Sequence, residues 1–168
     1  MKIKFLEEAD ICNYKKTSMF IGFPICTFKC DFESNTQICQ NWHLRKEPDI
    51  EISTEEIVQR YLNNPLSEAI VCGGFEPFET GWDVLDILQK LRERKCLDDF
   101  VIYTGYTEEE LNRFYGVVGD SYKEIIKYPN VIIKFGRFVP NQNHIFDKVL
   151  GVELASDNQY AKVFNKMR

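Results

Sequence analysis

Short apolar runs alternate along this chain with segments of helical periodicity. The runs are typical of buried strands and cover residues 18–25, 68–72, 100–103 and 131–135, with a weaker candidate at 161–164. Expected helices extend from a cap at Ser53 to about residue 63, from Gly81 to about 95, and from a cap at Thr107 to about 115. This alternation predicts a mainly parallel sheet with right-handed crossovers. A closed barrel needs eight βα units, and this chain has four or five. We therefore expect a single α/β domain over residues 1–168, built as a partial, open βα barrel.

The segments that follow the predicted strands carry the unusual residues. In parallel sheets, functional groups collect at the carboxyl ends of the strands, so these loops should meet at one rim. The segments are 26–41, 73–78, 104–106 and 136–140. We therefore expect one site that is assembled from four loops.

Composition narrows the possible classes of function. The chain has a net charge of −5 and no block of Lys or Arg, which argues against a nucleic-acid surface. Its first sixteen residues carry charges throughout, so they predict neither a signal peptide nor a membrane span. We expect a cytoplasmic protein without a membrane partner. In that reducing compartment its six cysteines are expected to be free thiols and metal ligands.

Three of these cysteines, Cys26, Cys30 and Cys39, fall in the loop that follows the first strand, with the spacing Cys-x3-Cys-x8-Cys. A thiolate-rich loop at a strand end favours a soft metal or an iron–sulfur cluster. Three ligands would leave one metal position open for a cofactor or substrate. The other three are expected to be ordinary thiols, with one of them a minor candidate as an additional ligand (Cys12) and two in apolar elements (Cys72 and Cys96).

Several short motifs follow one another between roughly residues 18 and 164. They are the Cys-x3-Cys start, Cys39-Gln40-Asn41, the Gly-Gly turn with Glu76-Pro77, VIYTGYTEEEL at 101–111, Gly136-Arg137-Phe138 and Ser156-Asp157-Asn158-Gln159. Together, and in this order, they resemble the radical S-adenosylmethionine superfamily, and within it the activating proteins of anaerobic ribonucleoside-triphosphate reductase. Each string is weak alone, and their collinearity is what makes the resemblance specific.

The resemblance implies a mechanism and a set of site residues. Cys26, Cys30 and Cys39 would bind three irons of a [4Fe–4S] cluster, and S-adenosylmethionine would chelate the fourth. The residues implied in cofactor binding are Asn41, Gly73, Gly74, Glu76, Thr104 and Asn158. Reductive cleavage would give a 5′-deoxyadenosyl radical that generates a glycyl radical on a large glycyl-radical enzyme, the anaerobic ribonucleotide reductase. The implied electron donor is a flavodoxin or a ferredoxin.

The chain departs from the family pattern at three places. Glu33 stands where the usual Cys-x3-Cys-x2-Cys spacing has its third cysteine, which suggests a six-residue insertion before Cys39. A longer loop costs little extra chain entropy. Phe75 occupies a glycine position of the cofactor turn, and Phe135 replaces an aspartate before Gly-x-Phe.

These departures leave alternatives open. The three cysteines could be structural thiols or a zinc site, and Glu33 could replace Cys39 as a ligand, although a carboxylate is a hard ligand. The function could also be radical chemistry on a small molecule or peptide. A third possibility is a cluster-binding module without catalysis.

Overall fold

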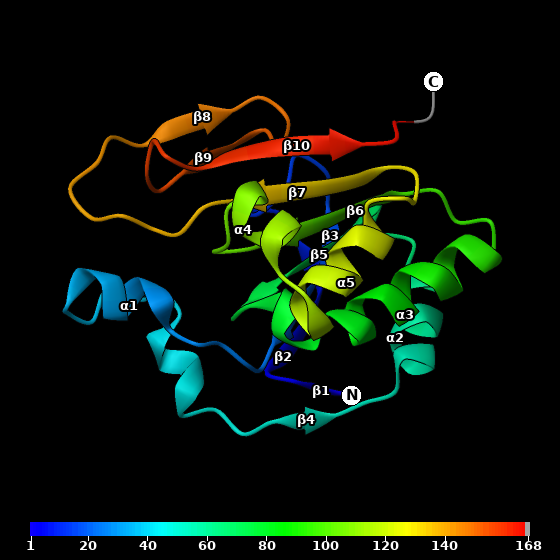
Figure 1. Ribbon diagram of the computed structural model, residues 1–168. Coiled ribbons are helices and arrows are strands. Elements are labelled where there is room, and N and C mark those ends of the chain that lie inside the picture. The colour runs from blue at the N-terminus through cyan, green and yellow to red at the C-terminus, as the bar shows by residue number, and fades with distance from the viewer. Residues whose placement is uncertain (167–168) are drawn as a thin grey trace.

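The structure is a computed structural model and describes residues 1–166. Its centre is a six-stranded sheet in the order β10-β7-β6-β5-β3-β2 (Figure 1). In chain order the strands are β2 (Phe5–Asp10), β3 (Ser18–Phe23), β5 (Ala69–Gly74), β6 (Asp99–Tyr103), β7 (Val131–Phe135) and β10 (Tyr160–Phe164). The four inner strands are parallel, and each edge strand is antiparallel to its neighbour. The prediction of an open, mainly parallel α/β fold is confirmed.

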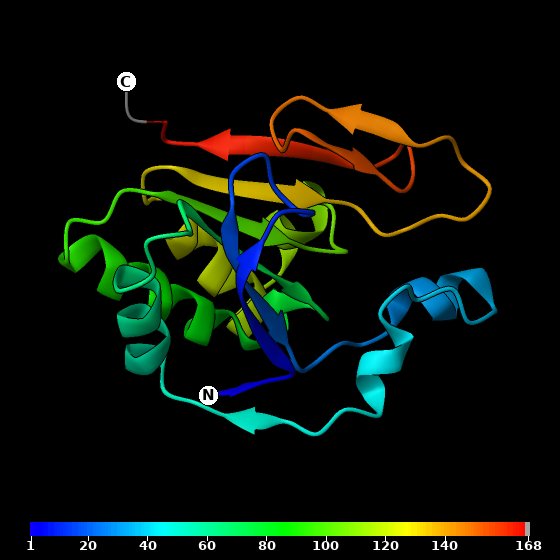
Figure 2. The same ribbon diagram turned by 180° about the vertical axis from the view of Figure 1, so that it is seen from behind.

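Three amphipathic helices cover one face of the sheet, as Figures 1 and 2 show. They are α2 (Thr54–Leu62), α3 (Gly81–Glu93) and α5 (Gly116–Ile125). The main core lies between the helices and this face, where Leu88 and Tyr122 pack with alternate strand residues such as Ile70 and Ile102. The sequence predicted α2 and α3, whereas α5 was not expected.

The intervening strand residues face the opposite side of the sheet, as the two-residue repeat of a strand requires. Ala69, Val71 and Val101 form a smaller apolar cluster there with Leu150 and Leu154. A two-stranded hairpin supplies part of this cover. It consists of β8 (Ile145–Asp147) and β9 (Val152–Leu154).

Short elements complete the chain. They are β1 (Lys2–Ile3), α1 (Lys29–Ser34), the 3-10 helices η1 (Trp42–Arg45) and η2 (Pro77–Thr80), β4 (Ile50–Glu51), which pairs with β1, and α4 (Glu108–Arg113). The predicted cap of α4 is a full capping box between Thr107 and Glu110. At α2, Ser53 accepts a hydrogen bond from the N–H of Glu56. Figure 1 shows α1 apart from the other helices, on the side where the loop after β7 projects.

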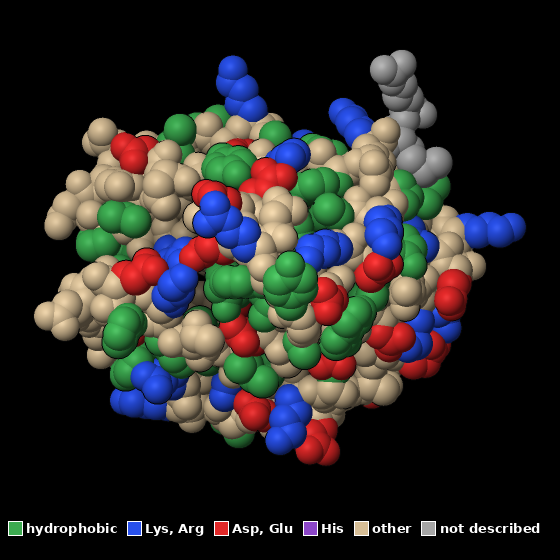
Figure 3. Space-filling view, viewed as in Figure 1, with side chains coloured by type: hydrophobic (Ala, Val, Ile, Leu, Met, Phe, Trp, Pro, Cys, Tyr) green, Lys and Arg blue, Asp and Glu red, His purple; other side chains and the backbone are tan. Residues whose placement is uncertain are grey.

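The surface mixes charges of both signs. On the face in Figure 3, Lys and Arg side chains are interspersed with Asp and Glu, and apolar side chains lie between them. Within residues 1–166, no helix has both the length and the apolar character needed to cross a membrane.

Candidate functional site

A cavity of about 300 Å³ lies at the carboxyl ends of the parallel strands. Its walls come from the loops after β3, β5, β6 and β7, the four segments that the sequence suggested. The predicted site residues that line it are Cys26, Cys30, Cys39, Asn41, Gly73, Gly74, Glu76 and Thr104. The volume lies at the lower end of the range for small-ligand pockets. One site therefore brings together all the predicted residues except Asn158.

The three cysteines of the loop are partly buried and all line this cavity. The Cys26 sulfur accepts a hydrogen bond from the N–H of Phe28 at 3.2 Å, and burial raises the pKa of Cys26 to about 11. Cys30 and Cys39 share a hydrogen bond, which raises the pKa of Cys30 and lowers that of Cys39. The other cysteines lie elsewhere: Cys12 is exposed, Cys72 is in the core and Cys96 contacts Asp98.

The segment read as an insertion is folded rather than open. Helix α1 begins at Lys29 and extends into this segment, where Asn35 ends it in a left-handed conformation with φ of 49°. One carboxylate oxygen of Asp31 then accepts hydrogen bonds from the N–H groups of Ile38, at 2.8 Å, and Cys39, at 2.7 Å. These bonds turn the loop back on itself and fix the backbone of Cys39 beside the cavity.

Glu33 does not line the cavity. Its side chain is half exposed, and its two oxygens lie 3.7 Å from Lys29 Nζ and 3.3 Å from Arg137 Nε. Two basic side chains thus engage the Glu33 carboxylate, and Cys39 is the residue that lines the cavity with the other two thiols.

The turn after β5 brings the backbone close to its neighbours. Gly74 has φ of 78°, and a Cβ there would lie 2.9 Å from the Cα of Gly22, so a side chain would be both strained and crowded. The Asn41 side chain donates to the Gly74 carbonyl and ties the cysteine loop to this turn. Phe75 avoids the left-handed region and packs edge-on against Phe28, with ring centroids 5.1 Å apart. The glycine replaced by Phe75 is therefore not needed for the backbone of this turn.

Glu76 is buried at the centre of the site and accepts three hydrogen bonds. They come from the N–H of Phe78 at 3.2 Å, the Thr104 hydroxyl at 2.8 Å and the N–H of Gly105 at 2.8 Å. Desolvation raises the pKa of Glu76 to about 7, against the lowering effect of these donors. The carboxylate joins the turns after β5 and β6, and three of its roughly four acceptor positions are occupied.

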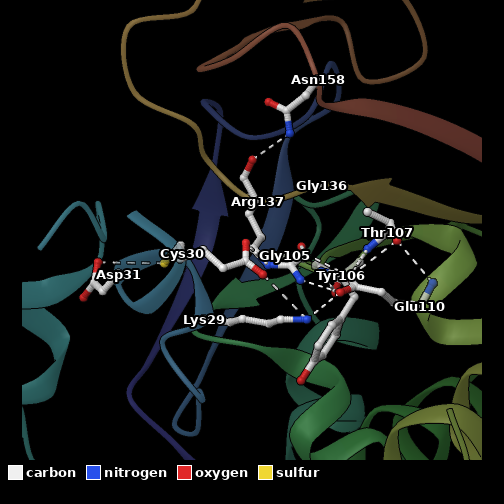
Figure 4. Close-up of polar contacts among 12 residues, drawn as sticks. Lys29, Cys30, Asp31, Gly105, Tyr106, Thr107, Glu110, Gly136, Arg137 and Asn158 are labelled. Atoms are coloured by element: carbon white, nitrogen blue, oxygen red, sulfur yellow. Dashed lines mark hydrogen bonds and ion pairs between the residues drawn. The ribbon is translucent and has the colours of Figure 1, made fainter. Parts of the chain in front are cut away.

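An ionic cluster links the cysteine loop to the far wall of the cavity (Figure 4). The carboxylate of Glu110 receives Lys29 Nζ at 2.6 Å and both terminal nitrogens of Arg137. Although partial burial acts in the opposite direction, these cations hold the pKa of Glu110 below its ordinary value. Glu110 also caps α4, so one carboxylate connects α1, α4 and the loop after β7.

Asn158 is the predicted site residue that does not line the cavity. It is exposed, and its side chain donates to the Arg137 carbonyl at 2.9 Å (Figure 4). Its neighbour Gln159 is buried, lines the cavity, and donates to the Gly136 carbonyl at 3.1 Å. The predicted Asn-Gln block does reach the site, but through Gln159.

Residues 16–159 match a protein family described as a 4Fe-4S single cluster domain. This chain belongs to that family. No curated protein and no solved structure matches the chain.

The side chains at the cavity can be compared with the ligands that a [4Fe–4S] cluster needs. The cavity offers three thiols, the preferred ligands of iron–sulfur clusters, and neither His43 nor His144 is among the lining residues. In residues 1–166, no three His, Cys, Asp or Glu side chains converge as a single-ion site. A cluster binds each thiolate through a different iron and does not need that convergence. The residues therefore fit a [4Fe–4S] cluster.

The cavity of this 4Fe-4S domain has further lining residues that the sequence reasoning missed. Besides Gln159, they include Asn13, Tyr103, Lys134 and Arg137. The sequence signal for Arg137 was its place in the Gly-x-Phe motif alone. The signal for Lys134 was a lone lysine in the apolar run VIIKF, where a charge is unusual.

Proposed function

We propose that this chain holds a [4Fe–4S] cluster on Cys26, Cys30 and Cys39 and uses it to cleave S-adenosylmethionine reductively. The radical so formed would generate a glycyl radical on a large partner enzyme of the anaerobic ribonucleotide reductase type. A flavodoxin- or ferredoxin-type protein would provide the electron. The single observation that carries the proposal is the meeting of three thiols with the Gly73–Glu76 turn in one cavity.

The chemistry that the bound cluster would supply is one-electron reduction of the sulfonium, which yields methionine and a 5′-deoxyadenosyl radical. The chain's own residues would position the cofactor and limit access of water. Gly73 and Gly74 line the cavity, so the amino end of the cofactor would lie beside their backbone. The free acceptor position of Glu76 suits an N–H donor of the cofactor's amino group.

The test is an anaerobic reconstitution with iron and sulfide, followed by dithionite and S-adenosylmethionine, with 5′-deoxyadenosine measured by mass spectrometry. We expect production that is lost in Cys26→Ala and retained in Cys12→Ala, a matched variant at an exposed thiol outside the cavity. A fully assembled cluster that yields no 5′-deoxyadenosine would contradict the proposed chemistry.

The occupied carboxylate of Glu76 favours a second candidate, a cluster-binding module without catalysis. In that case Glu76 would serve only as the link between two turns, through Thr104 and Gly105. The same assay separates the two candidates, because the module forms the cluster and cleaves nothing. Release of 5′-deoxyadenosine coupled to a small substrate, with no partner enzyme present, would instead indicate radical chemistry on a small molecule or peptide.

A further inference from the structure

Lys134 is a buried cation in the wall of the cavity. It lies in β7, opposite Tyr103 of β6, and only 7% of its surface is exposed. Its ammonium donates to the Gly136 carbonyl at 2.7 Å and lies 5.9 Å from the centre of the Tyr103 ring. An ammonium has three donors. Within the described residues, one donor has an acceptor and no carboxylate lies within ion-pair distance.

The other basic residues in the cavity wall are already paired. Lys29 and Arg137 both bind Glu110, and Arg137 also donates to the Gly105 carbonyl. Lys134 is thus the basic lining residue, among those described, that has no carboxylate partner. The positive charge available to an incoming ligand is concentrated at this one ammonium.

Such a residue is unfavourable for the fold itself. Burial of an ammonium without an anionic partner costs more free energy than burial of an apolar side chain of similar length. Its neighbours Ile132, Ile133 and Phe135 are all apolar and buried, so a methionine would suit the strand. A group that weakens the empty protein but lines its cavity is expected to interact with a ligand.

We propose that Lys134 binds the carboxylate of an amino-acid headgroup, the one carried by S-adenosylmethionine. This assignment rests on the proposed function. Among the described residues, Glu76 is the acidic side chain that lines the same cavity, and its charge acts on Lys134. An α-amino acid carries an amino group and a carboxylate, so its amino N–H would face Glu76 and its carboxylate would face Lys134. The two side chains together select for a headgroup that carries both groups.

The test compares two ligands on wild-type protein and on Lys134→Met. S-adenosylmethionine and its decarboxylated analogue are titrated calorimetrically into anaerobically reconstituted protein. We expect Lys134→Met to weaken S-adenosylmethionine binding by about 10- to 100-fold, the effect of losing a charged hydrogen bond in a buried site. Affinity for the decarboxylated analogue should stay the same or increase, because that ligand has no carboxylate to lose. Lys162→Met, at an exposed lysine that pairs with Glu108, is the control for charge alone.

A second measurement guards against a folding defect. The thermal midpoint of the ligand-free protein should be higher for Lys134→Met than for wild type, since the variant removes a buried unpaired charge. Equal weakening of both ligands, or no change for S-adenosylmethionine, overturns the assignment while the proposed function stands. If the wild type binds neither ligand, the proposed function fails and the assignment fails with it.

Discussion

The carboxylate of Asp31 accepts a hydrogen bond from the backbone N–H of Cys39 at 2.7 Å. The same oxygen binds the N–H of Ile38, so one side chain closes the longer loop between the second and third thiols. The sequence showed the extra length but not this closure. The insertion therefore carries its own means of holding the third cysteine in place.

Asp31→Ala should lower the iron content of the reconstituted protein several-fold. The change removes two charge-assisted hydrogen bonds, each worth roughly 1.5–3 kcal/mol, and releases the backbone of Cys39. Iron and sulfide analysis with electron paramagnetic resonance of the reduced cluster measures the effect. Asp31→Asn keeps an acceptor oxygen and should retain most of the cluster. Equal losses in the two variants would show that the hydrogen bonds are not what matters.

Cys39→Ala should abolish assembly of the [4Fe–4S] cluster, whereas Glu33→Ala should leave it intact. We expect this difference because Cys39 lines the cavity with the other thiols, whereas Glu33 does not line it and is paired with Lys29 and Arg137. The visible absorption of anaerobically reconstituted protein reports assembly directly. The opposite pattern would make Glu33 the third ligand and overturn the assignment of the insertion.

Glu76→Gln should change how stability depends on pH. The folded-state pKa of Glu76, about 7, lies above its unfolded value of 4.5 because of desolvation. The folded protein therefore holds this proton more tightly, and the stability it contributes is complete below about pH 4.5 and lost as pH rises through 7. Urea unfolding at pH 5 and pH 8 should show the wild type losing roughly 2–4 kcal/mol more than Glu76→Gln over that interval. Parallel pH profiles for the two proteins would contradict the expectation.

Glu110→Ala should loosen the cysteine loop without unfolding the sheet. It removes the carboxylate that binds Lys29 and Arg137, and it also removes half of the capping box of α4. Hydrogen exchange of residues 29–41, followed by mass spectrometry, should become several-fold faster than in the wild type. Glu109→Ala is the matched control, since Glu109 is exposed and pairs with Arg113 on its own helix. Unchanged exchange in Glu110→Ala would show that the ionic cluster does not hold the loop.

The inner strands could be predicted because each is a short apolar run, buried on both faces. The rim of the site followed from the rule that carboxyl ends of parallel strands meet. Helix α5 was not predicted because Gly116 and Gly119 lower the helix propensity of its sequence. Gly119 is nevertheless required by packing, since a Cβ there would meet the Phe114 carbonyl at 1.9 Å. Strand β2 was not predicted because its charged sequence lacks the apolar run of a buried strand and is typical of an exposed edge strand of a sheet.

Side-chain direction limited the prediction of the site. Asn158 and Gln159 are adjacent, and no periodic signal in a turn shows which of them is buried. The same limit applies to Lys134, whose place on the cavity side of β7 depends on strand register. Phe135, one residue later, belongs to the main core and packs near Tyr160 and Phe164. The aspartate expected at that position would have been a charge in the core.

The place of Gln159 in the chain also determines when the site is assembled during synthesis. The cysteine loop leaves the ribosome early, whereas the lining of the cavity is complete only after Gln159 has been made and β10 has paired with β7. A nascent chain that is stalled before Gln159 presents the three thiols in a cavity whose lining is still incomplete. Delivery of a cluster is therefore expected to be a post-translational event, and iron-delivery factors should recognise the finished sheet and not the emerging cysteine segment.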